Sequence, residues 1–349
     1  MTARNRSGRE EKKPRRRGVL GVTRTWLVAV AVLAAATGAA LLFGAPNSSG
    51  TIQAKQREIA SEQPEIILLG NSMLGEGIDE GLFEKLTGLS TYKWASGGSE
   101  TAYWYVAVKN VIATCSYRPE CLLLFFRDAF LTDPTNRVAG KYRDLIEQWT
   151  LAEEPLLDRL AYQSETGSRW ARALEKAWPL YGSRRRLRNK AEGYLKAAME
   201  AMLGVPSGQI ARAADTALGD SKLDPERLNE LQGAAEETSV PVFSEVVDRS
   251  LLPEIIRVTE DAGIQLILVR VKRRSDAMGI PQEPEMVEYI DALKAYLAER
   301  RIRILDFSDD LRIGIDLFAA GDHLDRGNGR PVFTRILAEA LAAARSSPE

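Results

Sequence analysis

The apolar run at residues 66–69, Ile-Ile-Leu-Leu, limits the possible folds of this chain more than any other stretch. Four consecutive apolar residues that end at Gly70 are typical of a strand buried on both faces, as in the middle of a parallel sheet. Asn71 and Ser72 follow directly and place a hydroxyl group at the carboxyl end of that strand. Open α/β sheets form their sites at this edge. The sequence therefore predicts a parallel α/β sheet with Ser72 at its functional edge.

More strand patterns follow, and helical sequence separates them. They lie at 91–95, 121–126, 265–270 and 302–307. This alternation predicts a parallel sheet with helices on both faces, a three-layer α/β sandwich. We expect the sandwich in two parts, at 64–140 and 241–349.

The segment 141–240 has helical repeats without a strand pattern, which predicts a helical insertion between the two parts. It contains the basic run Arg-Arg-Arg-Leu-Arg at 184–188. This run is either a solvated helix face or a contact for phosphate head groups or another anionic polymer.

The N-terminal residues predict a membrane anchor. Residues 1–25 form a basic arm with nine lysines and arginines against two glutamates. The stretch 26–45 has no charged residue, and its eighteen apolar or small residues as far as Phe43 would span roughly 27 Å as a helix. We expect a cytoplasmic arm, a single membrane-spanning helix at 26–45, a linker at 46–63 and a main domain outside the cytoplasm. A cleaved signal peptide and a buried soluble helix are the alternatives for 26–45.

Charge and metal-ligating residues exclude other classes of function. The net charge is −1, so the chain beyond the basic arm carries −8, which argues against nucleic-acid binding. One histidine and two cysteines offer no metal site, and no glycine-rich phosphate loop is present, so we expect neither metal nor cofactor. Cys115 and Cys121 could close a small disulfide loop in an oxidising compartment, with two buried thiols as the alternative.

The only histidine, His323, lies shortly before a predicted final helix at 331–344. A serine after the first core strand and a histidine before the last helix resemble the order found in SGNH (GDSL-type) hydrolases. The resemblance covers 65–130 and 240–345 and rests on four sequence blocks. It implies an SGNH-type, flavodoxin-like three-layer fold and acyl transfer to a serine.

The first two blocks concern the nucleophile and its backbone donors. Gly70-Asn71-Ser72-Met73 stands where the family usually has Gly-Asp-Ser. The resemblance implies that Ser72 is the nucleophile and that its own N–H is an oxyanion donor. The second block is Ser-Gly-Gly-Ser at 96–99, in which Gly98 is the second oxyanion donor or a plain turn glycine.

The other two blocks depart from the family pattern. Arg127 occupies the place of an asparagine that donates to the oxyanion, and a guanidinium can also donate there. It could instead bind a substrate carboxylate or pair with Asp128 or Asp133. The usual Asp-x-x-His is absent, because Ala320 stands three residues before the histidine. We assign Asp322 as the carboxylate that orients His323, and Asp325, Asp128 or a Ser–His dyad without a carboxylate stay open.

The resemblance extends to membrane-anchored enzymes that add or remove acetyl groups on envelope polysaccharides. It implies an extracytoplasmic serine esterase or O-acyltransferase that acts on an envelope or exported glycan, or on an acylated small molecule, through an acyl-serine intermediate. Some such enzymes work beside a membrane-bound O-acyltransferase. The alternative is a catalytically silent SGNH-like subunit that binds glycan or scaffolds an export complex. An esterase that acts on lipids is a third option.

Overall fold

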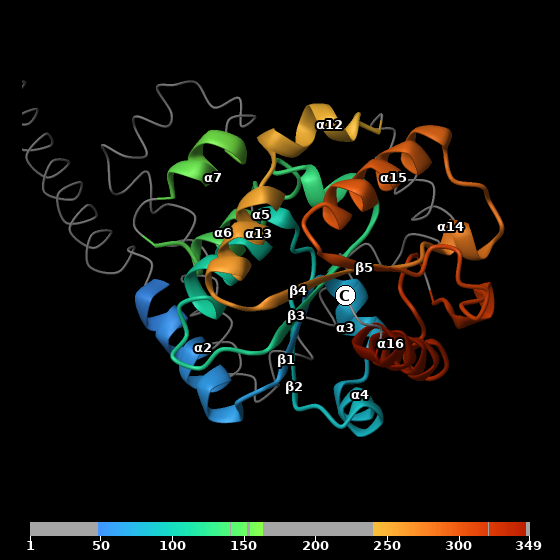
Figure 1. Ribbon diagram of the computed structural model, residues 1–349, viewed down its shortest axis with the longest axis horizontal. Coiled ribbons are helices and arrows are strands. Elements are labelled where there is room, and N and C mark those ends of the chain that lie inside the picture. Colours follow the sequence, from blue (N-terminus) through green and yellow to red (C-terminus); the bar gives the residue numbers. More distant parts are fainter. Residues whose placement is uncertain (1–47, 140, 152–153, 163–239, 320, 347–349) are drawn as a thin grey trace, which may run out of the picture. The chain divides into compact units, whose positions relative to one another are not determined.

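The computed structural model of the protein describes residues 48–139, 141–151, 154–162, 240–319 and 321–346. All of them belong to one compact unit. Its centre is a five-stranded sheet in which every pair of neighbours is parallel (Figure 1). The strands are β1 Ile66–Gly70, β2 Thr91–Ala95, β3 Cys121–Phe126, β4 Gln265–Arg270 and β5 Arg303–Asp306. The predicted parallel α/β sheet is confirmed.

The strand order β2-β1-β3-β4-β5 fixes the place of the site. The chain leaves β1 toward β2 on one side and continues later from β3 on the other side. The carboxyl end of β1 is therefore the topological switch point, where flavodoxin-like sheets bind their ligands. Ser72 follows β1 with one residue between them.

Two hydrophobic cores cover the two faces of the sheet. Side chains alternate along a strand, so neighbouring residues such as Leu123 and Leu124 enter different cores. Figure 1 shows α3, α4 and α16 on one face, with α2, α5 and α13 on the other. The helical elements are α2 Ser48–Glu62, α3 Ser72–Gly77, α4 Glu80–Thr87, α5 Thr101–Ala107, η1 Val108–Ile112, η2 Asp128–Thr132, α6 Lys141–Glu147, α7 Pro155–Leu160, α12 Phe243–Val246, η4 Val247–Arg249, α13 Leu252–Asp261, α14 Arg274–Ala277, α15 Pro284–Ala298, η5 Ile315–Leu317 and α16 Gly329–Ser346.

The segment expected as a linker is a helix in its described part. Helix α2 buries Ile52 and Ile59 in the core beside α5 and η1. Its few apolar positions are seven residues apart and the rest of its sequence is polar, so its hydrophobic stripe is too narrow to stand out. The prediction of a linker is corrected to a helix of the α/β unit.

The start of the expected insertion also packs on the sandwich. Trp149 and Leu157 are buried in the same core as α5. The helices α6 and α7 therefore belong to the compact unit. The basic run at 184–188 and the rest of the insertion as far as residue 239 lie outside the described residues.

The predicted disulfide is not formed, since both cysteines are free and buried. Cys115 packs in the core on the α5 side of the sheet, where its thiol donates to the Gln56 carbonyl at 3.4 Å. Cys121 opens β3 and packs in the opposite core. The sheet therefore separates the two sulfur atoms.

The predicted membrane span at 26–45 lies outside the described residues. Among the helices that the structure describes, none is long and apolar enough to cross a bilayer.

Candidate active site

The structure brings Ser72 and His323 together. Nε2 of His323 lies 2.9 Å from Oγ of Ser72, although 251 positions separate the two residues in the sequence. Both side chains are partly exposed, so a substrate can reach them. This is the contact that a serine nucleophile and its general base require.

The turn before Ser72 is fixed by Asn71, which caps helix α3. The Asn71 side-chain oxygen accepts from the Met73 N–H at 3.0 Å. Ser72 is the first residue of the helix, where amide groups lack a partner within the helix. Among the described residues nothing accepts from its N–H, which leaves it available to an oxyanion.

The histidine loop is held by its own backbone. The Ala319 N–H donates to the His323 carbonyl at 2.8 Å, and the Asp325 N–H donates to the Leu317 carbonyl at 2.8 Å. Asp325 itself accepts from the amides of Gly327 and Asn328, both at 2.9 Å. Its carboxylate therefore shapes the turn that leads into α16 and does not orient the histidine.

Asp322 does not play the role predicted for it. One carboxylate oxygen accepts from the Arg274 N–H at 2.9 Å, and the other forms an ion pair with Arg127. Asp322 lies in a turn directly before the histidine, and both of its carboxylate oxygens already have partners other than the imidazole ring. In the described part of the chain, Nδ1 has no hydrogen-bond partner. The contacts fit a Ser–His dyad with Asp322 as an anchor of the loop.

Arg127 has carboxylate partners at its Nε and Nη1, and its role as an oxyanion donor stays a prediction. Its Nε lies 3.2 Å from Asp128, and its Nη1 pairs with Asp322. The guanidinium also lies over the Phe130 ring, 5.3 Å from the ring centre. Arg127 thus ties the end of β3 to the histidine loop. Its contact with Asp128 is a pairing that the sequence left open, whereas the ion pair with Asp322 was not predicted.

Asp128 extends this charged cluster toward β4. It adopts a left-handed backbone conformation with φ of 52°, unusual for a residue with a side chain. Burial raises the pKa of its carboxyl, while Arg127 and Arg273 act in the opposite direction. Arg273 lies 3.4 Å from Asp128 and also pairs with Asp276. The ends of β3 and β4 are therefore linked through alternating charges.

Gly98 lies in a turn tied to the nucleophile's strand. The Ser96 N–H and the Ser99 hydroxyl both donate to the Gly70 carbonyl, at 2.9 and 3.2 Å. Gly98 has a φ of 74°, and a Cβ there would lie 2.5 Å from the Tyr142 ring. The φ angle and the close Tyr142 ring both require glycine at this position. The two hydrogen bonds to the Gly70 carbonyl hold the turn of Gly98 at the same sheet edge as Ser72.

Sequence reasoning missed Glu100, a buried carboxylate beside the nucleophile's turn. Only 5% of its surface is exposed, and it accepts from the Asn71 amide at 3.4 Å. Burial raises its pKa to about 7, while Arg137, Arg127 and the Asn71 amide lower it. A charged residue directly before the apolar helix 101–107 was the available signal.

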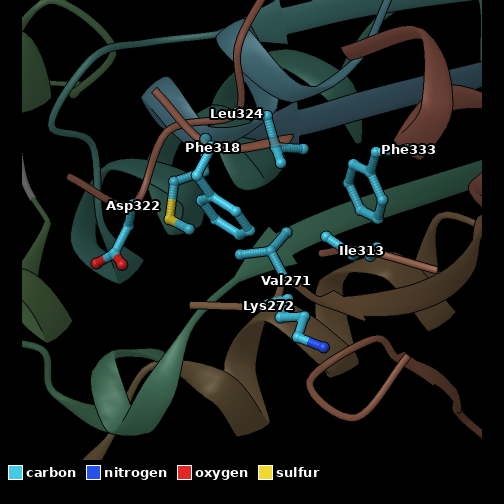
Figure 2. A pocket seen from close by; sticks show the side chains of 8 residues that line it. Val271, Lys272, Ile313, Phe318, Asp322, Leu324 and Phe333 are labelled. Atoms are coloured by element: carbon cyan, nitrogen blue, oxygen red, sulfur yellow. The ribbon is translucent and has the colours of Figure 1, made fainter. Parts of the chain in front are cut away.

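Several hollows lie near these residues, and one of about 410 Å³ is lined by Asp128 and Arg273. Figure 2 shows a narrow one, of about 10 Å³, among apolar side chains including Phe318 and Leu324, with the Asp322 carboxylate turned away from them. It has room for about one water molecule. A larger hollow of about 440 Å³ reaches Ser96 at the carboxyl end of β2, and Lys93 and Glu80 also line it.

Comparison with known proteins gives distant similarity only. No family model matches the sequence, and no curated protein matches it. Two similar crystal structures are a "putative acylhydrolase" from Bacteroides fragilis and a GDSL-like lipase from Bacteroides thetaiotaomicron. The first has 13% identity and a TM-score of 0.35 over 80% of this chain and 86% of its own. The second has 11% identity and a TM-score of 0.36 over 83% of this chain and 98% of its own.

Both structures carry names of the hydrolase class that the four sequence blocks resemble. Identities and TM-scores this low establish neither a fold nor an activity. The assignment of function therefore has to come from the residues of this chain.

Proposed function

We propose that this protein is an SGNH-type serine esterase or O-acyltransferase that works through a Ser72–His323 dyad. The observation that carries the proposal is the 2.9 Å contact between Nε2 of His323 and Oγ of Ser72 at the switch point of a parallel sheet. Acyl transfer to a serine requires at least a hydroxyl group and a base within hydrogen-bond distance of it.

The reaction follows from this geometry. Nε2 of His323 takes the Ser72 proton while Oγ attacks the ester carbonyl, and the tetrahedral oxyanion accepts from the Ser72 N–H. The imidazolium then protonates the leaving alcohol, which leaves an acyl-serine. Water or a sugar hydroxyl gives its proton to His323 and attacks the acyl group. The imidazolium then returns that proton to Oγ of Ser72 as the acyl product leaves, which restores the free serine and the neutral base. Gly98 is the second donor in this proposal.

Without a carboxylate at Nδ1, the imidazolium formed during the reaction is less stabilised than in a triad. The loop contacts compensate in part, because they fix the position of the ring through its backbone. Asp322 and Arg127 are therefore positioning residues in this proposal.

The larger hollow supports a hydroxyl-rich substrate such as a glycan. It borders Ser96, two residues from Gly98, and its charged side chains include Lys93 and Glu80. Charged side chains are strong hydrogen-bond partners for hydroxyl groups. We place the acceptor sugar there and keep the anchored, extracytoplasmic location with an envelope or exported polysaccharide as parts of the proposal. The basic arm and apolar stretch at 1–45 support that location, and a membrane-bound O-acyltransferase is the proposed partner.

One observation favours a second candidate, a silent SGNH-like subunit that binds glycan. Asp322 is committed to Arg127 and Arg274, which leaves His323 without a carboxylate partner among the described residues. A site that has lost its orienting group could keep the fold and bind without catalysis.

The deciding experiment measures acetate release from a p-nitrophenyl ester by the purified full chain and by Ser72→Ala and His323→Ala. Ser61→Ala is the matched control, because Ser61 is an exposed serine on α2. We expect turnover in the parent and control and its loss in both site variants. Equal turnover in all four proteins would refute the dyad. A parent that neither turns over nor forms an acyl adduct on Ser72, detected by intact mass, would favour the silent subunit.

A further inference from the structure

The Asn71 side chain makes two different hydrogen bonds that fix its orientation. Its oxygen accepts from the Met73 N–H at 3.0 Å, and its nitrogen donates to the Glu100 carboxylate at 3.4 Å. Asn71 is 8% exposed and Glu100 is 5% exposed, so both groups are shielded from water. A buried hydrogen bond to a charged acceptor holds its donor firmly.

This pair explains why the sequence departs from Gly-Asp-Ser. An aspartate at position 71 could still cap α3, but its second oxygen would face the Glu100 carboxylate. Two buried carboxylates at hydrogen-bond distance cannot both stay ionised. An amide is therefore the side chain that Glu100 requires at position 71.

Glu100 also contacts the glycine turn. Nη1 of Arg137 lies 3.9 Å from the Glu100 carboxylate, and the Arg137 guanidinium lies over the Tyr142 ring, 5.5 Å from its centre. Both Arg137 and Tyr142 pack against Gly98. One carboxylate thus connects the turn that carries Ser72 with the turn that carries Gly98.

We propose that Glu100 is a positioning residue that acts through Asn71 to fix the position of Ser72 relative to the glycine turn. This inference rests on the proposed function, because it assigns to Glu100 the placement of the two oxyanion donors. It predicts an effect on kcat with little effect on KM, since the interaction serves the reacting geometry and not the binding of substrate.

The protonation of Glu100 gives a second readout. Its neighbours are the Asn71 amide, Arg137, Arg127 and Asp128, and burial raises its pKa to about 7. The ionised form is the better acceptor for the Asn71 amide. Activity should therefore fall as pH drops through neutrality, and Glu100→Gln should remove the part of this fall that comes from Glu100.

The test is a double-mutant cycle with Asn71→Asp, Glu100→Gln and the two combined, in the full chain. The combined variant exchanges donor and acceptor, because a glutamine amide at position 100 can donate to a carboxylate at position 71. We expect Asn71→Asp to lower kcat by about tenfold or more and the combined variant to recover most of that loss, with KM nearly constant.

A matched control is available elsewhere in the unit. The Asn110 amide donates to the buried Glu154 carboxylate at 2.8 Å, away from Ser72. Asn110→Asp should lower the melting temperature without the loss in kcat. A combined variant no faster than Asn71→Asp, or losses of kcat that simply follow melting temperature, would overturn the role of Glu100.

The two proposals fail in different ways. A Ser72 that shows neither turnover nor covalent labelling would refute the proposed function and the role of Glu100 with it. A reactive Ser72 with additive effects of the two substitutions would refute only the role of Glu100.

Discussion

Arg127 forms an ion pair with Asp322, the residue directly before the only histidine of the chain. The arginine follows β3 and the aspartate lies in the loop before α16, so the pair joins the sheet edge to the loop that presents His323. The position of the base therefore depends on a charge contact that involves neither of its ring nitrogens.

Asp322→Asn should lower kcat by about tenfold, because a neutral amide weakens a charge-assisted contact with Arg127. Steady-state kinetics and thermal melting of the same preparation measure the effect. Asp310→Asn is the control, since the Asp310 carboxylate forms its ion pair with the exposed Arg312 and not with Arg127. If Asp322→Asn retained full kcat, the loop would not need this anchor.

Glu100 should make the stability of the protein depend on pH. Because burial raises its pKa from 4.5 to about 7, the folded protein keeps a proton that the unfolded chain has released. The stability that this group contributes should therefore be lost as the pH rises from 4.5 to about 7, by about 3 kcal/mol in total. Relative to the parent, Glu100→Gln should gain stability by that amount between pH 4 and pH 8. Urea unfolding at both pH values measures it, and parallel changes in the two proteins would contradict it.

Gly98→Ala should destabilise the protein more than Gly88→Ala. Both glycines have a left-handed φ, of 74° and 71°, but a Cβ at Gly98 meets Tyr142 at 2.5 Å whereas nothing lies within 4 Å at Gly88. Both substitutions carry the same cost of roughly 1–2 kcal/mol for a side chain in left-handed backbone. The difference between the two losses of stability therefore measures the steric contact with Tyr142. Only the substitution at Gly98 should also reduce kcat. Equal losses of stability in the two variants would show that a Cβ at position 98 does not contact the Tyr142 ring.

Ile59→Ala should cost about 2–5 kcal/mol, because the side chain is fully buried between α2 and the sandwich. Gln53→Ala, on the exposed face of the same helix, should change stability by less than about 0.5 kcal/mol. Urea unfolding distinguishes the two. If Ile59→Ala left the free energy of unfolding unchanged, α2 would not be packed on the sandwich, and the linker predicted from the sequence would be correct.

Cys121 should stay unreactive in the folded protein. Burial raises the pKa of its thiol to about 12, so almost no thiolate exists at neutral pH. Iodoacetamide should label both cysteines only after unfolding, and a reducing agent should leave the melting temperature unchanged. A melting temperature that drops on reduction would point to a disulfide.

The sequence was informative where one residue type carries the signal. The apolar run at 66–69 and the following serine predicted β1 and its edge, and the rarity of histidine led directly to His323. Helix α2 was hidden because only Ile52 and Ile59 mark its buried face.

Contacts between segments could not be predicted. The partners of Asp322 are Arg127, which follows β3, and Arg274 in α14. No local sequence pattern predicts that Arg127 pairs with this carboxylate. The separation of Cys115 and Cys121 depends on which side of β3 the chain approaches. Glu100 was missed for the same reason, since its partner Asn71 lies in another turn.

The 251-position separation between Ser72 and His323 has a consequence for synthesis. A ribosome must reach residue 323 before the base can meet the nucleophile, so a nascent chain that already holds Ser72 but ends before this residue lacks its proton acceptor. Under the proposed function, ester chemistry by this dyad can begin only after synthesis has passed residue 323.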